Sequence, residues 1–421
     1  MTLFPLARAL STTTLLALCV GLPILTSPAT AQDFEFDFSG SASAFARHTQ
    51  IGATDLVPDP AAQGYADNRS GADLVLRPEL KFGILKFATQ LRLTTETDKD
   101  PEAVMDEAYL EVAATDQLFL AIGRRNLTYG QAYGLNPSDL FRVPLTENRV
   151  FPSEKSRRDV AGIDIVSADL LFDNSASLQV IYALNESASD GTKPFWMLRY
   201  SAVAADGALD FGLSAFGGSR PGIGATASFS VGDASVIYAD ATLRRGRNRQ
   251  TVLGFTSTGA LQLDPLDTDT IRPFVTLGLS HTFASGLTLN AELSHDANGQ
   301  NDTEWARTAA ALQDLTPVTS AQSGAALGQL NGVLNQYTQR QNYGFVRLSK
   351  ENLFGTELTG EFTVLHGFDD NSGNFGLRVE YAVTDNARIG VQATQTYGGT
   401  NDEFRLRPDQ SSLSLYTMVT F

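Results

Sequence analysis

The chain has 421 residues, of which 43 % are hydrophobic, and a formal net charge of −16 at pH 7. A phosphate partner needs a basic face, so this acidic balance argues against nucleic-acid binding. Nothing after residue 31 approaches a run of roughly 18 apolar residues, which excludes a transmembrane helix from that part of the sequence.

The N-terminal segment has the layout of a secretory signal peptide. Arg8 precedes a short apolar segment over 15–25, and an A-x-A cleavage site ends at Ala31. The apolar segment is too short to span a membrane as a helix. We therefore predict a signal peptide over 1–31 and one mature domain over 32–421. The only cysteine is removed with the signal, so the mature chain has no disulfide and no thiol chemistry.

Beyond the signal, apolar and polar side chains alternate in nearly every segment. In 373–384, Phe375 and Leu377 share one face while Arg378 and Glu380 share the other. A membrane-spanning β-barrel distributes its hydrophobicity in this way, because one face of each strand meets lipid and the other meets water. Runs bounded by Gly, Pro, Asn and Asp predict about eighteen such strands. The predicted strands are 33–47, 72–82, 84–97, 105–114, 117–125, 159–171, 175–184, 194–203, 207–217, 222–231, 234–245, 271–283, 287–297, 341–350, 355–366, 373–384, 386–397 and 411–421.

The lengths of the connections provide an independent test of these strands. Connections after even-numbered strands are tight turns, whereas the long connections all follow odd-numbered ones. Barrels have short periplasmic turns and long outer loops, so this sorting fits an N-terminus in the periplasm. We predict an all-β fold, a closed antiparallel transmembrane β-barrel of about 18 strands, or 16 if the weakest hairpin, 207–231, is absent. The long connections are 48–71, 126–158, 246–270 and 298–340.

The last strand ends on Phe421, with Leu413, Leu415 and Val419 on the same face. It resembles the C-terminal recognition strand of Gram-negative outer-membrane β-barrels. The resemblance implies an outer-membrane location after cleavage near Ala31, with the barrel-assembly machinery, outer-membrane lipid and lipopolysaccharide as partners. It also admits a homotrimer.

A second resemblance lies where the chain enters the connection 126–158. Residues 123–141 contain Gly-Arg, an aromatic–Gly pair and Asn-Pro-x-Asp followed by an aromatic residue, and Tyr129 stands where Trp is more frequent. This resembles a pattern in substrate-transporting outer-membrane barrels of the porin superfamily. It implies that 126–158 folds into the barrel and narrows it. The alternative is a purely structural strand-to-loop transition built on the turn at 136–139.

Strand parity places many charged side chains on the inner wall, and charges inside a lipid-embedded structure are costly unless they line water. Asp164 is assigned to the same wall. A slight excess of carboxylates favours weak cation preference, although many charges are expected to pair with each other. The basic pore and constriction candidates are Arg92, Arg125, Arg142, Lys155, Arg157, Arg158, Arg199, Arg272, Arg347, Arg378 and Arg388. The acidic candidates are Glu107, Glu111, Asp139 and Glu361.

The connection 298–340 has apolar residues at helical spacing, which predicts helices over 302–315 and 322–339. Two short helices on the outer rim would either shield the rim or partly plug the pore.

Catalytic and metal-binding patterns are weak. The four histidines show no metal-ligand spacing. Adjacent strand residues face opposite ways, so Ser280 and Ser294 face the lumen while His281 and His295 face outward, which excludes a Ser–His pair within one strand. We predict no enzyme and no cofactor. Acidic segments such as 264–269 are expected to be solvated, with Ca²⁺ as the alternative.

The sequence therefore predicts a porin that passes small hydrophilic solutes and ions by diffusion. One alternative is a substrate-specific channel or exporter with 298–340 as a lid. Another is a structural barrel without an open pore.

Overall fold

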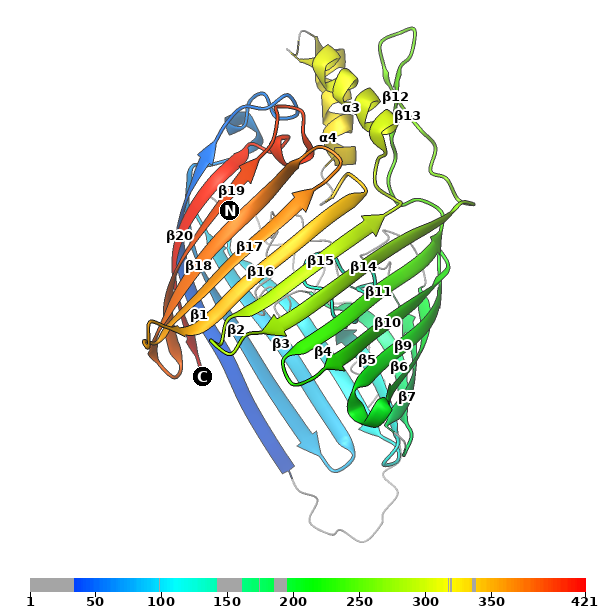
Figure 1. Ribbon diagram of the computed structural model, residues 1–421, viewed down its shortest axis with the longest axis vertical. Coiled ribbons are helices and arrows are strands. Elements are labelled where there is room, and N and C mark those ends of the chain that lie inside the picture. The colour runs from blue at the N-terminus through cyan, green and yellow to red at the C-terminus, as the bar shows by residue number, and fades with distance from the viewer. Residues whose placement is uncertain are drawn as a thin grey trace, which may run out of the picture.

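The computed structural model describes residues 34–97, 99–141, 161–173, 175–184, 195–316, 318, 320–334 and 338–421. Eighteen strands form one antiparallel sheet in which each strand pairs with its neighbours in sequence. The sheet closes because β1 pairs with both β2 and β20 (Figure 1). The barrel strands are β1 (Phe34–Ile51), β2 (Asn68–Phe82), β3 (Leu85–Glu96), β4 (Glu102–Ala113), β5 (Leu118–Arg125), β6 (Ile163–Leu171), β7 (Ala176–Ala183), β8 (Trp196–Ala204), β9 (Leu209–Gly217), β10 (Gly222–Val231), β11 (Ser235–Arg245), β14 (Ile271–Thr282), β15 (Thr288–Asp296), β16 (Asn342–Leu353), β17 (Leu358–Gly367), β18 (Ser372–Thr384), β19 (Ala387–Tyr397) and β20 (Asp409–Thr420).

The predicted closed barrel is confirmed, and the strand count is eighteen rather than sixteen. The doubtful hairpin is present as β9 and β10. The first outer connection is shorter than predicted because β1 continues to Ile51 and β2 begins at Asn68. The last residues of β1 break the apolar alternation, yet Gln50 still lies opposite Ser411 of β20. Pairing with β20 therefore extends a strand that its side chains alone would have ended.

The outward face of the wall is apolar, as lipid contact requires. Leu277, Leu293 and Leu415 are 57, 62 and 60 % exposed. At the end with the tight turns, the ring of Phe421 stacks on Phe38 with centroids 6.0 Å apart. The backbone N–H of Gly40 donates to the carbonyl of Phe421 at 2.7 Å, so the last residue takes part in closing the barrel. None of the helices in the described ranges is long and apolar enough to cross a membrane.

The long loops gather at the opposite end, where two helices and a small hairpin stand above the rim (Figure 1). The predicted helices are present as α3 (Asp302–Leu315) and α4 (Ala321–Leu334). Asn301 and Glu304 form a capping box that satisfies free N–H groups at the start of α3. Helix α4 stops before its predicted end at 339, because the backbone there bonds elsewhere: the N–H of Gln339 donates to Glu403 at 2.7 Å. The hairpin of β12 (Val252–Phe255) and β13 (Leu261–Leu263) was not predicted. In the described ranges, the other short elements are the 3-10 helices η3 (Ala61–Gln63), η4 (Ala205–Gly207) and η5 (Glu403–Arg405).

Candidate functional site: the lumen and its inward loop

The chain leaving β5 turns into the lumen and bonds to the far wall. The backbone N–H groups of Gln131 and Ala132 both donate to Oδ2 of Asp240, on β11, at 2.8 Å. Those of Tyr133 and Gly134 donate to Oε1 and Oε2 of Glu292, on β15, at 2.6 and 2.8 Å. The described part of the predicted constriction loop, 126–141, therefore lies inside the barrel.

The two carboxylates that hold this loop are deeply buried. Asp240 is 0 % and Glu292 is 3 % exposed. A buried carboxylate is costly unless it is hydrogen-bonded. Here each of the two carboxylates accepts hydrogen bonds from two peptide N–H groups. The hydroxyl of Tyr238 adds a further donor to Glu292 at 2.7 Å. The wall and the loop thus satisfy each other, which fixes the loop at one height in the lumen.

The loop is shaped by a glycine and a turn. Gly130 has φ +84°, and a Cβ there would lie 2.6 Å from Asn136 and 2.8 Å from Asp240. Only glycine fits both the backbone conformation and the close approach. The predicted turn is present, since Oδ1 of Asn136 accepts the N–H of Ser138 at 3.0 Å. Its Nδ2 donates to the carbonyl of Tyr129 at 2.6 Å, so the turn ties both limbs of the loop together.

An apolar patch on the inner wall seats the base of the loop. The ring of Phe141 contacts those of Tyr129 and Phe195, with centroids 6.0 and 5.0 Å away. Ile163 and Ile165 of β6 face the same cluster and are 6 and 0 % exposed. Here the inner face of the barrel is apolar because protein, not water, covers it.

This apolar patch explains one wrong prediction. Asp164 was assigned to the lumen, but it shares the outward face with Val166, which is 41 % exposed. It lies opposite Arg124 in register and pairs with it, Nε to Oδ1, at 2.9 Å. Assigning Asp164 to the lumen placed the isoleucines on either side of it on the lipid face by alternation, but they face inward, where the inward loop covers them.

Three of the predicted pore residues form one charged ladder across β16, β17 and β18. Nη2 of Arg347 lies 2.6 Å from Oε2 of Glu361, and Arg378 pairs with the other oxygen of the same carboxylate. The guanidinium of Arg347 also lies 5.5 Å from the ring centre of Tyr133, in the inward loop. The ladder therefore lies beside the constriction and carries two positive charges for one negative charge.

A second group of predicted residues surrounds the root of the loop. Arg125 stacks on Tyr109 at 4.9 Å and approaches Glu111 at 3.7 Å. Glu107 accepts the backbone N–H of Asn126 at 2.8 Å, so it positions the chain where the loop begins.

Other predicted basic residues are dispersed. Arg199 lies over the ring of Tyr129 at 5.0 Å. Arg272 pairs with Asp267 at 3.0 Å near the outer rim. Arg388 lies exposed near the tight-turn end of β19.

Arg92 has a partner that the sequence reasoning missed. Its guanidinium pairs with Asp106 at 2.9 Å, and Asp106 is 0 % exposed. A register shift after Gln90 leaves Asp106 as an extra residue of β4, so both it and Glu107 point inward. Strict alternation cannot reveal such a bulge.

The remaining predicted residues are only partly tested by the structure. Asp139 is half-buried in the turn of the inward loop, where its N–H lies 3.4 Å from the carbonyl of Asn136. The predicted constriction residues Arg142, Lys155, Arg157 and Arg158 lie outside the described residues, and their role stays a prediction.

Four outer loops share one apolar core above the rim. The core joins the first outer loop, the β12–β13 hairpin, both helices and the loop before β20. Its buried members are Leu56, Val57, Val252, Leu261, Trp305, Ala311, Leu312, Leu315, Ala326, Leu327, Leu330, Leu334 and Leu406. Within this outer cap, as we name the assembly, Arg247 of the connection before β12 pairs with Glu304 of α3 at 2.7 Å. Arg249 of the same connection pairs with Asp296 of β15 at 3.4 Å and so ties the cap to the barrel.

One histidine contacts a serine of the neighbouring strand. Across two strands, Nδ1 of His281 lies 2.8 Å from Oγ of Ser235, on the outward face. The argument against a Ser–His pair considered only neighbours within one strand and missed this one. Among the described residues no carboxylate hydrogen-bonds to the His281 ring, whose other close neighbour is Phe283 at 4.5 Å. The pair therefore lacks the third group that orients a catalytic histidine.

The acidic segment 264–269 is organised by hydrogen bonds within the protein. Oδ1 of Asp267 accepts the N–H groups of Asp269 and Thr270 at 2.9 and 3.1 Å. Among the described residues, no group of three or more metal-ligating side chains is placed to hold an ion. Ca²⁺ binding at this segment remains an untested prediction.

The fold is that of outer-membrane porins. No protein-family model matches the chain, and no curated protein matches it in sequence. In structure it is similar to Pseudomonas aeruginosa OccK1 (OpdK), with a TM-score of 0.56 and 10 % identity over 92 % of this chain and 98 % of that one. It is also similar to P. aeruginosa OccK2 (OpdF) in complex with glucuronate, with a TM-score of 0.55 and 12 % identity over 92 and 96 %. A third similar structure is OccK11 (OpdR) of the same organism, with a TM-score of 0.54 and 10 % identity over 92 % of this chain and 96 % of that one. At such identities the likeness establishes the closed 18-stranded barrel.

Proposed function

We propose that the protein is a porin of the outer membrane, a water-filled channel through which small hydrophilic solutes and ions diffuse passively. The observation that carries the proposal is the inward loop, held by Asp240 and Glu292 across a closed barrel. A loop fixed inside the lumen narrows the channel and leaves the surrounding barrel wall unchanged. The charged ladder at Arg347 and Glu361 lines the same level of the barrel, as an aqueous path requires.

Conductance across a planar bilayer tests this function. The mature protein, refolded in detergent and added to one side, should give discrete ohmic steps. Heat-denatured protein from the same preparation is the control for detergent artefacts. A correctly folded protein that gives no steps would contradict the porin and favour a structural barrel without an open pore.

A second candidate is a channel specific for one class of solute, with the outer cap as a lid. The observation that favours it is the apolar core shared by four loops, since a cap that only shields the rim does not need Trp305 and Leu312 buried at 7 and 0 % exposure. OccK2 was solved in complex with glucuronate and OpdK with vanillate, so two barrels of similar fold hold small carboxylates. Small steps that one carboxylate blocks at low concentration would support the specific channel, and steps indifferent to carboxylates would support the general porin.

Export to the outer membrane is part of the same proposal. It requires removal of residues 1–31, so N-terminal sequencing of protein from purified outer membranes should begin at Gln32. A sequence that begins at Met1 would contradict this route. The homotrimer and the use of the barrel-assembly machinery also remain proposals, which cross-linking in intact membranes tests.

A further inference from the structure

The last outer loop, between β19 and β20, reaches two separate parts of the molecule within a few residues. Leu406 is 2 % exposed and belongs to the apolar core of the outer cap. Phe404, two positions earlier, is 9 % exposed and belongs instead to a cluster on the inner wall. The other buried members of this lumen cluster, as we name it, are Tyr343, Phe345 and Leu365. Phe404 lies in the short helix η5 and Leu406 ends it, so one turn of chain joins the cap to the lumen.

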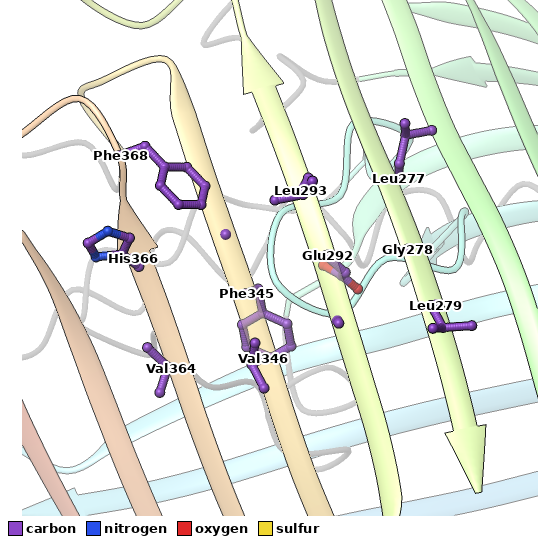
Figure 2. A pocket seen from close by; sticks show the side chains of 12 residues that line it. Leu277, Gly278, Leu279, Glu292, Leu293, Phe345, Val346, Val364, His366 and Phe368 are labelled. Atoms are coloured by element: carbon purple, nitrogen blue, oxygen red, sulfur yellow. The ribbon is translucent and has the colours of Figure 1, made fainter. Parts of the chain in front are cut away.

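The lumen cluster also receives the inner end of the inward loop. Tyr133 and Leu135 pack against it. A Cβ at Gly134 would lie 2.7 Å from the side chain of Phe345, so the loop and the wall are in close contact there. Phe345 lies opposite Glu292 in register (Figure 2), and Glu292 accepts two N–H groups of the same loop segment. The apolar contacts and the hydrogen bonds therefore hold one short stretch of the loop.

Hydrogen bonds join the lumen cluster to the cap. The carboxylate of Glu403 accepts the N–H of Gln339 at 2.7 Å and the hydroxyl of Tyr343 at 2.8 Å. The same hydroxyl accepts the N–H of Arg340 at 2.7 Å. Gln339 and Arg340 end the connection that carries both cap helices. The cap is therefore bonded to a side chain of the lumen cluster as well as to the last outer loop.

Successive inward side chains of β16 complete the path to the charged ladder. Side chains alternate faces along a strand, so Tyr343, Phe345 and Arg347 all face the lumen. Tyr343 bonds to the last outer loop, and Phe345 contacts the inward loop. Arg347 lies 5.5 Å from the ring centre of Tyr133 and pairs with Glu361. Packed groups thus run without a break from the cap core to the ladder.

We propose that Phe404 is a positioning residue of the constriction, and that through it the outer cap controls the position of the inward loop. Closely packed groups do not shift independently, because a displacement of one forfeits the dispersion contacts of its neighbours. Loosening the cap core at Leu406 removes a support of Phe404, and the lumen cluster that holds the inward loop loosens in turn. The proposal rests on the inward loop being the constriction of the proposed channel.

Amide hydrogen exchange of the full mature protein, folded in detergent, measures this coupling because exchange reports local opening. Leu406→Ala should accelerate exchange in the cap, over 302–334. It should also accelerate exchange at 131–134, in the inward loop, by at least about tenfold, equivalent to about 1.4 kcal/mol. In the Phe404→Ala background the same substitution should still accelerate the cap but should add nothing at 131–134.

Two further variants are controls. Phe404→Leu keeps an apolar side chain in the lumen cluster and should preserve the response of 131–134 to Leu406→Ala. Leu253→Ala changes a 37 % exposed residue of the cap hairpin and should leave exchange in both segments as in the wild type. Folding of each variant is checked by the gel shift between boiled and unheated samples, and Leu406→Val replaces Leu406→Ala if the smaller residue prevents folding.

Exchange at 131–134 that stays at the wild-type rate in Leu406→Ala would overturn the coupling. A response of 131–134 that persists undiminished in the Phe404→Ala background would overturn the role of Phe404. Exchange is measured without ion flow, so a barrel that fails to conduct contradicts the proposed function without deciding this test.

Discussion

Oε2 of Glu292 accepts the backbone N–H of Gly134 at 2.8 Å, although the two residues are 158 positions apart in the chain. The bond joins a loop that begins at β5 to strand β15 on another part of the wall. It is made by a carboxylate and a peptide group, and a Cβ at Gly134 would lie 2.7 Å from Phe345, so the close approach of the loop to the wall also requires glycine at this position.

Glu292→Gln should loosen the inward loop. The carboxamide keeps one acceptor oxygen but replaces the other with an NH₂ group that faces an N–H donor. Leaving such a donor unsatisfied costs about 1–3 kcal/mol. We expect noisier single-channel currents and a higher mean conductance in planar bilayers.

Glu357→Gln is the control for this change, because Glu357 is exposed near the tight-turn end and far along the chain from the loop contact. Its traces should match those of the wild type. If Glu292→Gln folds and conducts as the wild type does, the carboxylate does not set the position of the loop.

Glu361→Gln should shift the ion selectivity of the channel towards anions. The carboxylate is shared by Arg347 and Arg378, so its neutralisation leaves two positive charges without their common partner. The reversal potential in a KCl gradient measures the permeability ratio directly. Asp385→Asn removes the same charge from a turn outside the lumen and should leave the reversal potential unchanged. Equal potentials for all three proteins would place the ladder away from the ion path.

Leu312→Ala should destabilise the outer cap without unfolding the barrel. Leu312 is 0 % exposed in the core that the outer loops share. Removing its side chain should cost about 2–5 kcal/mol of local stability. Faster amide hydrogen exchange over 302–334, with unchanged exchange in the strands, is the expected result.

Leu266→Ala is the matched control, since Leu266 lies in an outer loop but is 49 % exposed. Amide hydrogen exchange in Leu266→Ala should equal that of the wild type. If exchange accelerated over the strands as well, cap and barrel would unfold as one unit.

The attachment of the cap should weaken as the pH rises towards neutrality. Glu403 is 6 % exposed and accepts the N–H of Gln339 at 2.7 Å and the hydroxyl of Tyr343 at 2.8 Å. Burial raises the pKa of Glu403 to about 7; the charge of Asp370 contributes to the rise, while the hydrogen bonds from Gln339 and Tyr343 and the charge of Arg249 oppose it. The attached cap therefore binds a proton that the detached cap releases. Its extra stability is complete below about pH 4.5 and is lost as the pH rises through about 7.

Limited proteolysis of 298–340 between pH 5 and 8 measures this dependence. Cleavage in the wild type should accelerate with pH, beyond the intrinsic pH dependence of the protease on an unfolded substrate. Glu403→Gln cannot titrate and should show a flat profile. A wild-type profile as flat as that of the variant would show that Glu403 does not control the attachment.

The eighteen strands, their order along the chain and the two cap helices follow from the sequence. Period-two alternation in segments such as Phe375 to Glu380 is a local property of the chain, and so is the sorting of long and short connections. Both can be recognised without knowing which segments are in contact. Ion pairing among the inner-wall charges was also expected, and Arg347 pairs with Glu361 on the neighbouring strand.

Contacts between distant segments were decided only by the tertiary structure. Asp240 and Glu292 look like any other inward carboxylate in the sequence, and the loop that they hold bonds to them through backbone N–H groups, which no side-chain pattern records. The isoleucines beside Asp164 face inward because that loop covers them, and Asp106 points inward because of a bulge. Alternation along a strand divides its side chains between two faces. Whether a face contacts lipid, water or another part of the protein depends on residues far away in the chain.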